Sequence, residues 1–251
     1  MPITQEFTYL KPETLNEAVA QLVKHGRRAR VLAGGTDLVG WLRDNLVRPE
    51  VVIDVKGIGG LYELDYRDKA LQIGALATWN DLIDFPEVKR YCPVLWEAAR
   101  AVGSSGLRNR ATLVGNICSA VPCCDGGPAL LVYEAEIHLT GPAGHRSVPV
   151  TEWFAGPRKT ALREGELVTG IVVPQLGAKH GGAFVKLGRY RGEDLAQASV
   201  TVLALSGDGY RVAFGAVAPV PFRARKVEEI LAGKKLTPAL IAQARKAALQ
   251  E

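Results

Sequence analysis

The stretch "VLAGGTDL", residues 31–38, decides how the N-terminal part of the chain folds. It reads as a short buried strand, two glycines and a helix that starts at Thr36 or Asp37. Glycines in such a turn leave backbone N–H groups open to a ligand, and a helix N-terminus favours negative charge, as phosphate groups do. The turn is equally compatible with a tight connection that binds nothing, because it is neither a G-x-G-x-x-G motif nor a Walker A loop.

A second glycine-containing segment, "ATLVGNICSAVPCCDGGPALL", spans residues 111–131. We expect a loop of small and polar residues that leads into an apolar helix. Two loops of this kind could hold a diphosphate from both sides. Asp125 could then accept a hydrogen bond from a ribose or ribityl hydroxyl. The residues alone therefore suggest a dinucleotide site without establishing one.

The flanking segments mix helical and strand patterns. Residues 14–26 predict a helix with a capping box at Thr14 and Glu17 and a stop at Gly26. Two alternating runs between residues 61 and 76 predict a hairpin. Further expected elements are strands at 29–35 and 50–55, helices at 36–46 and 93–104, three strand-like runs between 135 and 174, three strand or buried-helix candidates between 183 and 217, and helices at 223–233 and 237–250.

This pattern predicts an α+β fold in two domains. The most linker-like stretch is "PQLGAKHGG", residues 174–182. We place the boundary within it, which gives domains at 1–176 and 177–251. Within the first domain the alternating, hairpin-like pattern begins at Leu61, and we divide the domain into parts of about 1–55 and 56–176.

Composition excludes several classes of protein. The chain has 251 residues and a net charge of +5, with basic and acidic residues interspersed, and it contains no nucleic-acid-binding module. No apolar run reaches the roughly 18 residues of a membrane span, and no signal peptide is visible. Four cysteines without a secretory signal favour a reducing compartment, so we expect a cytoplasmic protein.

The two glycine segments, taken together, resemble a known family. "LAGGTDL" followed by "RNRATLVGNICSAVPCCDGGPALL" is similar to the FAD-binding, or medium, subunit of molybdenum hydroxylases, the xanthine dehydrogenase and carbon monoxide dehydrogenase group. "FVKLGRYRGEDLAQASV" at 184–200 and "GAVAPVPFRARKVEEILAGKKL" at 215–236 resemble later motifs of the family in the same order. The resemblance covers nearly the whole chain.

The resemblance implies a fold and a set of site residues. The fold is a two-part FAD-binding domain of the vanillyl-alcohol oxidase/PCMH type followed by a smaller α+β C-terminal domain. FAD is expected to bind noncovalently, because neither loop contains a histidine. The residues that match the family's FAD contacts are Leu32, Ala33, Gly34, Gly35, Thr36, Asp37, Leu38, Thr112, Gly115, Asn116, Ser119, Asp125, Val168 and Lys186. No catalytic residue and no metal ligand is predicted in this chain.

One position departs from the family pattern. The family has two glycines before the asparagine, whereas this chain has Val114 and Gly115. Valine is branched at Cβ, so residue 114 must use ordinary φ and ψ values. A close approach of the backbone to a ligand is therefore disfavoured at this one position.

The cysteine run has three explanations, which the sequence leaves open. Cys118, Cys123 and Cys124 could be small packing residues, redox-active thiols near the flavin, or part of a metal site with Cys92. Their spacing is a poor match to zinc or iron–sulfur patterns. Some relatives bind a [4Fe–4S] cluster through a cysteine-bearing insertion, and this chain has no further cysteine between Asp125 and Val168.

The resemblance also implies a function. The chain would hold FAD and pass electrons between [2Fe–2S] clusters of a small partner subunit and an external acceptor such as NAD, while a large molybdopterin subunit oxidises the substrate. Molybdopterin and [2Fe–2S] clusters are expected only in those partners, in a heterotrimer that is commonly doubled. The alternatives are a stand-alone flavoprotein of the vanillyl-alcohol oxidase type and an assembly or scaffold subunit that has lost FAD.

Overall fold

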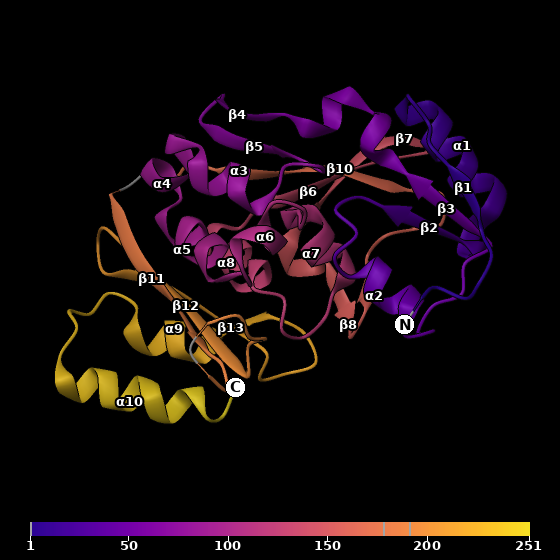
Figure 1. Cartoon of the computed structure of the whole chain (residues 1–251). Coiled ribbons are helices and arrows are strands. Elements are labelled where there is room, and N and C mark those ends of the chain that lie inside the picture. Colours follow the sequence, from indigo (N-terminus) through magenta and orange to yellow (C-terminus); the bar gives the residue numbers. More distant parts are fainter. Residues whose placement is uncertain (1, 178, 191) are drawn as a thin grey trace.

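The computed structural model describes residues 2–177, 179–190 and 192–251 (Figure 1). Its strands form a three-stranded, a five-stranded and a four-stranded sheet and a two-stranded ribbon. Among the described residues, no helix is both long and apolar enough to cross a membrane.

The N-terminal sheet is parallel and has the order β1-β3-β2. Its strands are β1 (Thr8–Leu10), β2 (Ala29–Leu32) and β3 (Val51–Asp54), connected by the helices α1 (Leu15–His25) and α2 (Leu38–Arg43). The predicted start and stop of α1 are confirmed. The Thr14 hydroxyl accepts a hydrogen bond from the Glu17 N–H at 3.2 Å, and Gly26 ends the helix with φ of 51°. Helix α2 begins after Asp37, as predicted.

The central sheet is antiparallel, with β10 in its middle and the order β4-β5-β10-β6-β7. The predicted hairpin is confirmed as β4 and β5, whose turn residues Asp68 and Lys69 both have positive φ. The bounds are β4 (Leu64–Arg67), β5 (Ala70–Gly74), β6 (Glu136–Gly141), β7 (Gly144–Pro149) and β10 (Leu167–Pro174), and the ribbon is β8 (Phe154–Gly156) and β9 (Lys159–Thr160).

Six helices connect β5 to β6 in the described chain: α3 (Trp79–Asp84), α4 (Pro86–Tyr91), α5 (Pro93–Ala101), α6 (Ser105–Arg108), α7 (Leu113–Ser119) and α8 (Gly126–Tyr133). The expected second loop is thus largely helical, and its interpretation as one loop was wrong. Helix α7 begins because the Thr112 hydroxyl accepts from the Gly115 N–H at 2.9 Å. It ends at Ala120, which adopts a left-handed conformation with φ of 44°. The apolar helix after it is confirmed as α8.

The C-terminal sheet is antiparallel with the order β11-β12-β13-β14. Its strands are β11 (His180–Leu187), β12 (Ala198–Leu205), β13 (Gly209–Gly215) and β14 (Phe222–Arg223), followed by α9 (Arg225–Leu231) and α10 (Pro238–Ala248). The three strand-or-helix candidates are therefore strands. The linker-like stretch 174–182 is shorter than predicted because β11 already starts at His180; Ala178 lies outside the described residues.

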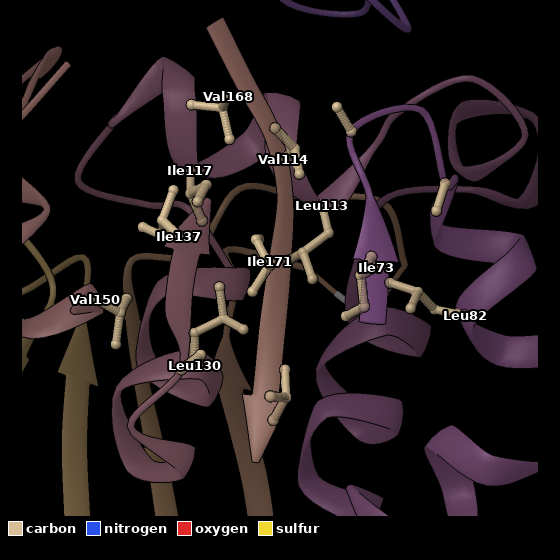
Figure 2. Packing of buried hydrophobic residues seen from close by; sticks show 14 of the residues in the cluster. Ile73, Leu82, Leu113, Val114, Ile117, Leu130, Ile137, Val150, Val168 and Ile171 are labelled. Atoms are coloured by element: carbon tan, nitrogen blue, oxygen red, sulfur yellow. The ribbon is translucent and has the colours of Figure 1, made fainter. Parts of the chain in front are cut away.

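One hydrophobic core joins the central and C-terminal sheets. It surrounds β10, where Ile171 packs among Ile73, Ile137 and Leu130 (Figure 2). Leu203 of β12 and Ala213 of β13 belong to the same cluster. Helices α5 and α8 pack against the C-terminal sheet, and α9 and α10 form a smaller core with β12 and β13. This packing fixes the C-terminal sheet beside the segment 111–131.

Candidate functional site

A cavity of about 1180 Å³ lies where the two glycine segments, β10 and β11 meet. Its lining includes every predicted site residue except one: Ala33, Gly34, Gly35, Thr36, Asp37, Leu38, Thr112, Gly115, Asn116, Ser119, Asp125, Val168 and Lys186. Leu32 does not line the cavity but packs with Leu38, Leu42 and Val52. The structure thus brings together residues that are up to 153 positions apart in the sequence, from Ala33 to Lys186.

The two glycine segments touch each other through their backbones. A Cβ atom on Gly34 would lie 1.8 Å from the carbonyl oxygen of Arg110, so only glycine fits there. The next residue, Gly35, has φ of 80°, a conformation that other residues rarely adopt. The Ser119 hydroxyl also hydrogen-bonds the Asp37 carboxylate. These contacts hold the first segment against the second along one wall of the cavity.

Lys56 supports the first glycine segment from behind. Its Nζ donates to the Ala33 carbonyl oxygen at 3.3 Å and lies 2.7 Å from Asp54 Oδ1. Asp54 is buried, and its other carboxylate oxygen accepts from the Tyr9 hydroxyl. Burial opposes the charge on Asp54, but hydrogen bonds from Lys56 and Tyr9 outweigh it, so its pKa lies below the usual value. The network fixes the carbonyl that precedes Gly34.

Two polar residues of the second segment, Thr112 and Asn116, bond to its own backbone. Thr112 caps α7 through the Gly115 N–H. Asn116 Oδ1 accepts from the Gly126 N–H at 3.0 Å and so ties α7 to the start of α8. The Thr112 hydroxyl hydrogen and the Asn116 amide group keep donors for a ligand. Val114 lies inside α7 with a negative φ, as its branching predicts.

Asp125 and Lys186 form an ion pair in the cavity wall. Lys186 Nζ donates to Asp125 Oδ2 at 2.7 Å and to the Ala101 carbonyl oxygen at 3.1 Å. Burial raises the pKa of Asp125, while the Lys186 charge and hydrogen bond oppose this shift. Asp125 Oδ1 is buried and has no hydrogen-bond partner. It is therefore an acceptor that a ligand could satisfy.

Val168 lies at an irregularity of β10. The register of β10 against β6 shifts between Val168 and Gly170. The Val168 side chain is buried in the core (Figure 2) and also borders the cavity. Its position near a bound cofactor stays a prediction.

The cysteines occupy two environments. Cys118 and Cys123 line the cavity, whereas Cys92 and Cys124 are buried. Burial raises the pKa of Cys92, Cys118 and Cys124 to about 12, and burial followed by the Asp125 charge raises that of Cys123. These thiols are protonated at neutral pH, which favours the packing explanation. In the described chain, no group of three or more His, Cys, Asp or Glu residues could hold a metal ion.

Sequence reasoning missed four residues that line the cavity or support its wall. Lys56 has no motif, and only the fold brings it to Ala33. Trp41 and Arg158 both line the cavity, with the Arg158 guanidinium 5.1 Å from the Trp41 ring centroid. Trp79 lines it too, but a lone tryptophan at a helix start reads as an ordinary core residue. The sequence held no signal for these four positions.

Comparisons with known proteins agree with this geometry. Residues 5–176 match the family described as the FAD binding domain in molybdopterin dehydrogenase, and residues 183–251 match the CO dehydrogenase flavoprotein C-terminal domain. The chain is 34% identical over 250 residues to the carbon monoxide dehydrogenase medium chain of Hydrogenophaga pseudoflava, covering 98% of this chain and 87% of that one. It is 29% identical over 228 residues to a putative xanthine dehydrogenase FAD-binding subunit of Escherichia coli, covering 88% and 78%.

A solved structure gives the same result for the fold. Carbon monoxide dehydrogenase from Hydrogenophaga pseudoflava, in a form that lacks the Mo-pyranopterin moiety, superposes with a TM-score of 0.95 at 35% identity, covering 100% of this chain and 88% of that chain. The predicted two-part fold with a smaller C-terminal domain is confirmed. The relatives are subunits of multi-subunit dehydrogenases, so the chain is an oxidoreductase subunit that works with partner subunits. It belongs to the family of FAD-binding medium subunits of the molybdenum hydroxylases.

Proposed function

We propose that the cavity holds FAD noncovalently and that the chain passes electrons between the [2Fe–2S] clusters of a small partner subunit and an external acceptor such as NAD. The observation that carries this proposal is the meeting of both glycine segments, Asp125 and Lys186 around one cavity of about 1180 Å³. Pockets for drug-sized ligands measure roughly 300–1,000 Å³, so the cavity has room for a dinucleotide. We assign the FAD contacts to the predicted residues that line it.

The residues present fit the cofactor. Gly34 and Gly35 offer backbone without side chains, where a diphosphate can approach closely. Asp125 Oδ1 offers an unpaired acceptor for a hydroxyl of the cofactor. Lys186 brings a positive charge next to Asp125, and Arg158, Lys159 and Arg189 also line the cavity. The chemistry that FAD supplies when bound is one- and two-electron transfer, and the chain supplies position, charge and exclusion of water.

The proposal includes a division of the chain and its partners. We assign residues 1–176, with parts of about 1–55 and 56–176, to FAD binding and residues 177–251 to the C-terminal domain. The family matches at 5–176 and 183–251 support this division. We assign molybdopterin to a large partner subunit and the [2Fe–2S] clusters to a small one, in a doubled heterotrimer. The names of the relatives as medium chains support this composition. A cytoplasmic location stays a prediction.

The experiment that tests the proposal is purification of the full chain followed by absorbance spectroscopy. We expect a flavin spectrum, release of the flavin into the supernatant when the protein is denatured, and no substrate oxidation by the chain alone. Anaerobic addition of NADH should bleach the flavin band if NAD is the acceptor. A chain that stays colourless after incubation with FAD would support the scaffold alternative. Substrate oxidation without partners would support the stand-alone flavoprotein.

A further inference from the structure

Two buried polar atoms without a hydrogen-bond partner belong to residues that line the cavity. They are Asp125 Oδ1 and the indole Nε1 of Trp79. Asp125 is already among the proposed FAD contacts, but no motif points to Trp79. An indole N–H can only donate a hydrogen bond, whereas an ionised carboxylate can only accept one. Each of these two residues therefore borders the cavity and carries one polar atom that the protein leaves unsatisfied, and the Trp79 side chain itself is fully buried.

Trp79 is held firmly in place. It is the first residue of α3, behind a complete capping box between Thr78 and Asp81. Its backbone N–H donates to the Ala111 carbonyl oxygen at 3.0 Å, and Thr78 forms a β-bridge with Thr112. A Cβ atom on Gly126 would lie 3.1 Å from Cη2 of the Trp79 ring. The indole is thus fixed between the start of α7 and the start of α8, beside Asp125.

The unpaired N–H of Trp79 differs from the indole N–H groups of Trp153 and Trp96. The indole of Trp153, equally buried, donates to the Ile117 carbonyl oxygen at 3.0 Å, and that of Trp96 donates to the Ile83 carbonyl oxygen at 3.1 Å. Buried polar groups in native proteins are nearly always hydrogen-bonded, because an unmet one destabilises the fold. A partner supplied by a bound molecule explains why Trp79 departs from this rule.

We infer that Trp79 is a cofactor-binding residue, whose indole N–H donates a hydrogen bond to an acceptor of the FAD molecule. This inference rests on the proposed function. The isoalloxazine ring carries carbonyl oxygens and ring nitrogens, and the ribityl chain carries hydroxyl oxygens, so the cofactor offers acceptors along its length. Trp79 and Asp125 together contribute a donor and an acceptor, which fixes the orientation of a molecule that presents both kinds of group.

Nuclear magnetic resonance of the ¹⁵N-labelled full chain tests this contact directly. The chain has four tryptophans and hence four indole N–H signals. Addition of FAD should move the Trp79 signal downfield and slow its hydrogen exchange. The Trp96 signal should stay in place, because Trp96 already donates to Ile83 and does not line the cavity. This measurement uses the unaltered protein, so it does not depend on whether a variant folds.

A pair of matched variants gives an independent readout. Trp79→Phe keeps an aromatic ring but removes the donor, and it should weaken FAD binding about threefold to tenfold. Trp96→Phe removes a donor outside the cavity and should leave the FAD dissociation constant unchanged. If the wild-type chain binds no FAD, both this inference and the proposed function fail. If it binds FAD while the Trp79 signal and the affinity of Trp79→Phe are unchanged, the proposed function stands and the Trp79 contact is refuted.

Discussion

The Nζ atom of Lys186 lies 2.7 Å from Oδ2 of Asp125, and this ion pair connects β11 of the C-terminal sheet to the start of α8. The two side chains are 12% and 9% exposed, so each charge depends on the other for its stabilisation. The pair borders the cavity, beside the acceptor Oδ1 that has no partner. The C-terminal sheet therefore contributes a charge to the candidate FAD site as well as covering it.

Removing the cation should destabilise the fold. In Lys186→Met, Asp125 keeps its buried carboxylate but loses its partner, and the free energy of unfolding should fall by about 2–3 kcal/mol. Urea unfolding at neutral pH measures this loss. The double variant Asp125→Asn, Lys186→Met should recover part of it, because no unpaired charge remains. Lys235→Met, at an exposed position, is the control and should be neutral. An unchanged free energy of unfolding in Lys186→Met would contradict the pairing of Lys186 with Asp125.

Asp125 and Glu166 should give opposite pH dependences of stability. Hydrogen bonds from Arg146 at 2.6 and 2.7 Å hold the pKa of Glu166 below its usual value of 4.5. The free energy of unfolding should therefore be higher for wild type than for Glu166→Gln. This difference should have its full value above pH 4.5 and should disappear as the pH falls through the lowered pKa of Glu166.

Burial shifts Asp125 the other way, since its pKa is raised above 3.8. The folded chain then binds a proton more tightly than the unfolded chain. The free energy of unfolding of wild type, relative to that of Asp125→Asn, should be highest below pH 3.8. It should fall as the pH rises through the raised pKa of Asp125. Urea unfolding of the three proteins across the acidic range compares both slopes. If both stability differences changed with pH in the same direction, the environment of either Asp125 or Glu166 would be misassigned.

The contact between the two glycine segments can be broken at one atom. Gly34→Ala would place Cβ 1.8 Å from the Arg110 carbonyl oxygen, so the segments must separate. We expect a loss of about 1–3 kcal/mol in stability and at least a tenfold loss of FAD affinity. Gly40→Ala is the matched control, because no atom lies within 4 Å of its Cβ position and alanine is the better helix former. Normal FAD retention by Gly34→Ala would move the site elsewhere.

Local patterns predicted the elements that depend on local chemistry. Helix α1 follows from its capping box and Gly26, and the hairpin β4–β5 follows from alternation around a polar turn. Helix α7 did not follow, because Gly115, Asn116 and Ser119 are weak helix formers, and burial of Leu113 and Ile117 overrides their preferences. Propensity is a weak guide wherever packing against the core decides the structure.

The candidate site likewise has features that local sequence patterns predict and features that depend on tertiary packing. Its glycine segments could be predicted because the chemistry of phosphate binding leaves a residue pattern in the chain. The contact of Gly34 with Arg110 and the approach of Lys56 to Ala33 depend on how the chain folds in three dimensions. No residue type or spacing in the sequence predicts them. The unpaired indole of Trp79 is likewise visible only when every hydrogen bond around it is known.

The thiols beside the cavity should act as packing residues. Cys124 is buried and protonated at neutral pH, since burial raises its pKa to about 12, and Cys123 is shifted in the same direction. A buried thiol behaves as a small hydrophobic group, so Cys123→Ala, Cys124→Ala should lose about 1–2 kcal/mol of stability and keep its FAD content. Anaerobic reductive titration should consume the same number of electrons in the variant and in wild type. Fewer electrons in the variant would instead show that the thiols exchange electrons with the flavin, and stoichiometric iron with acid-labile sulfide in the wild-type chain would show a metal site.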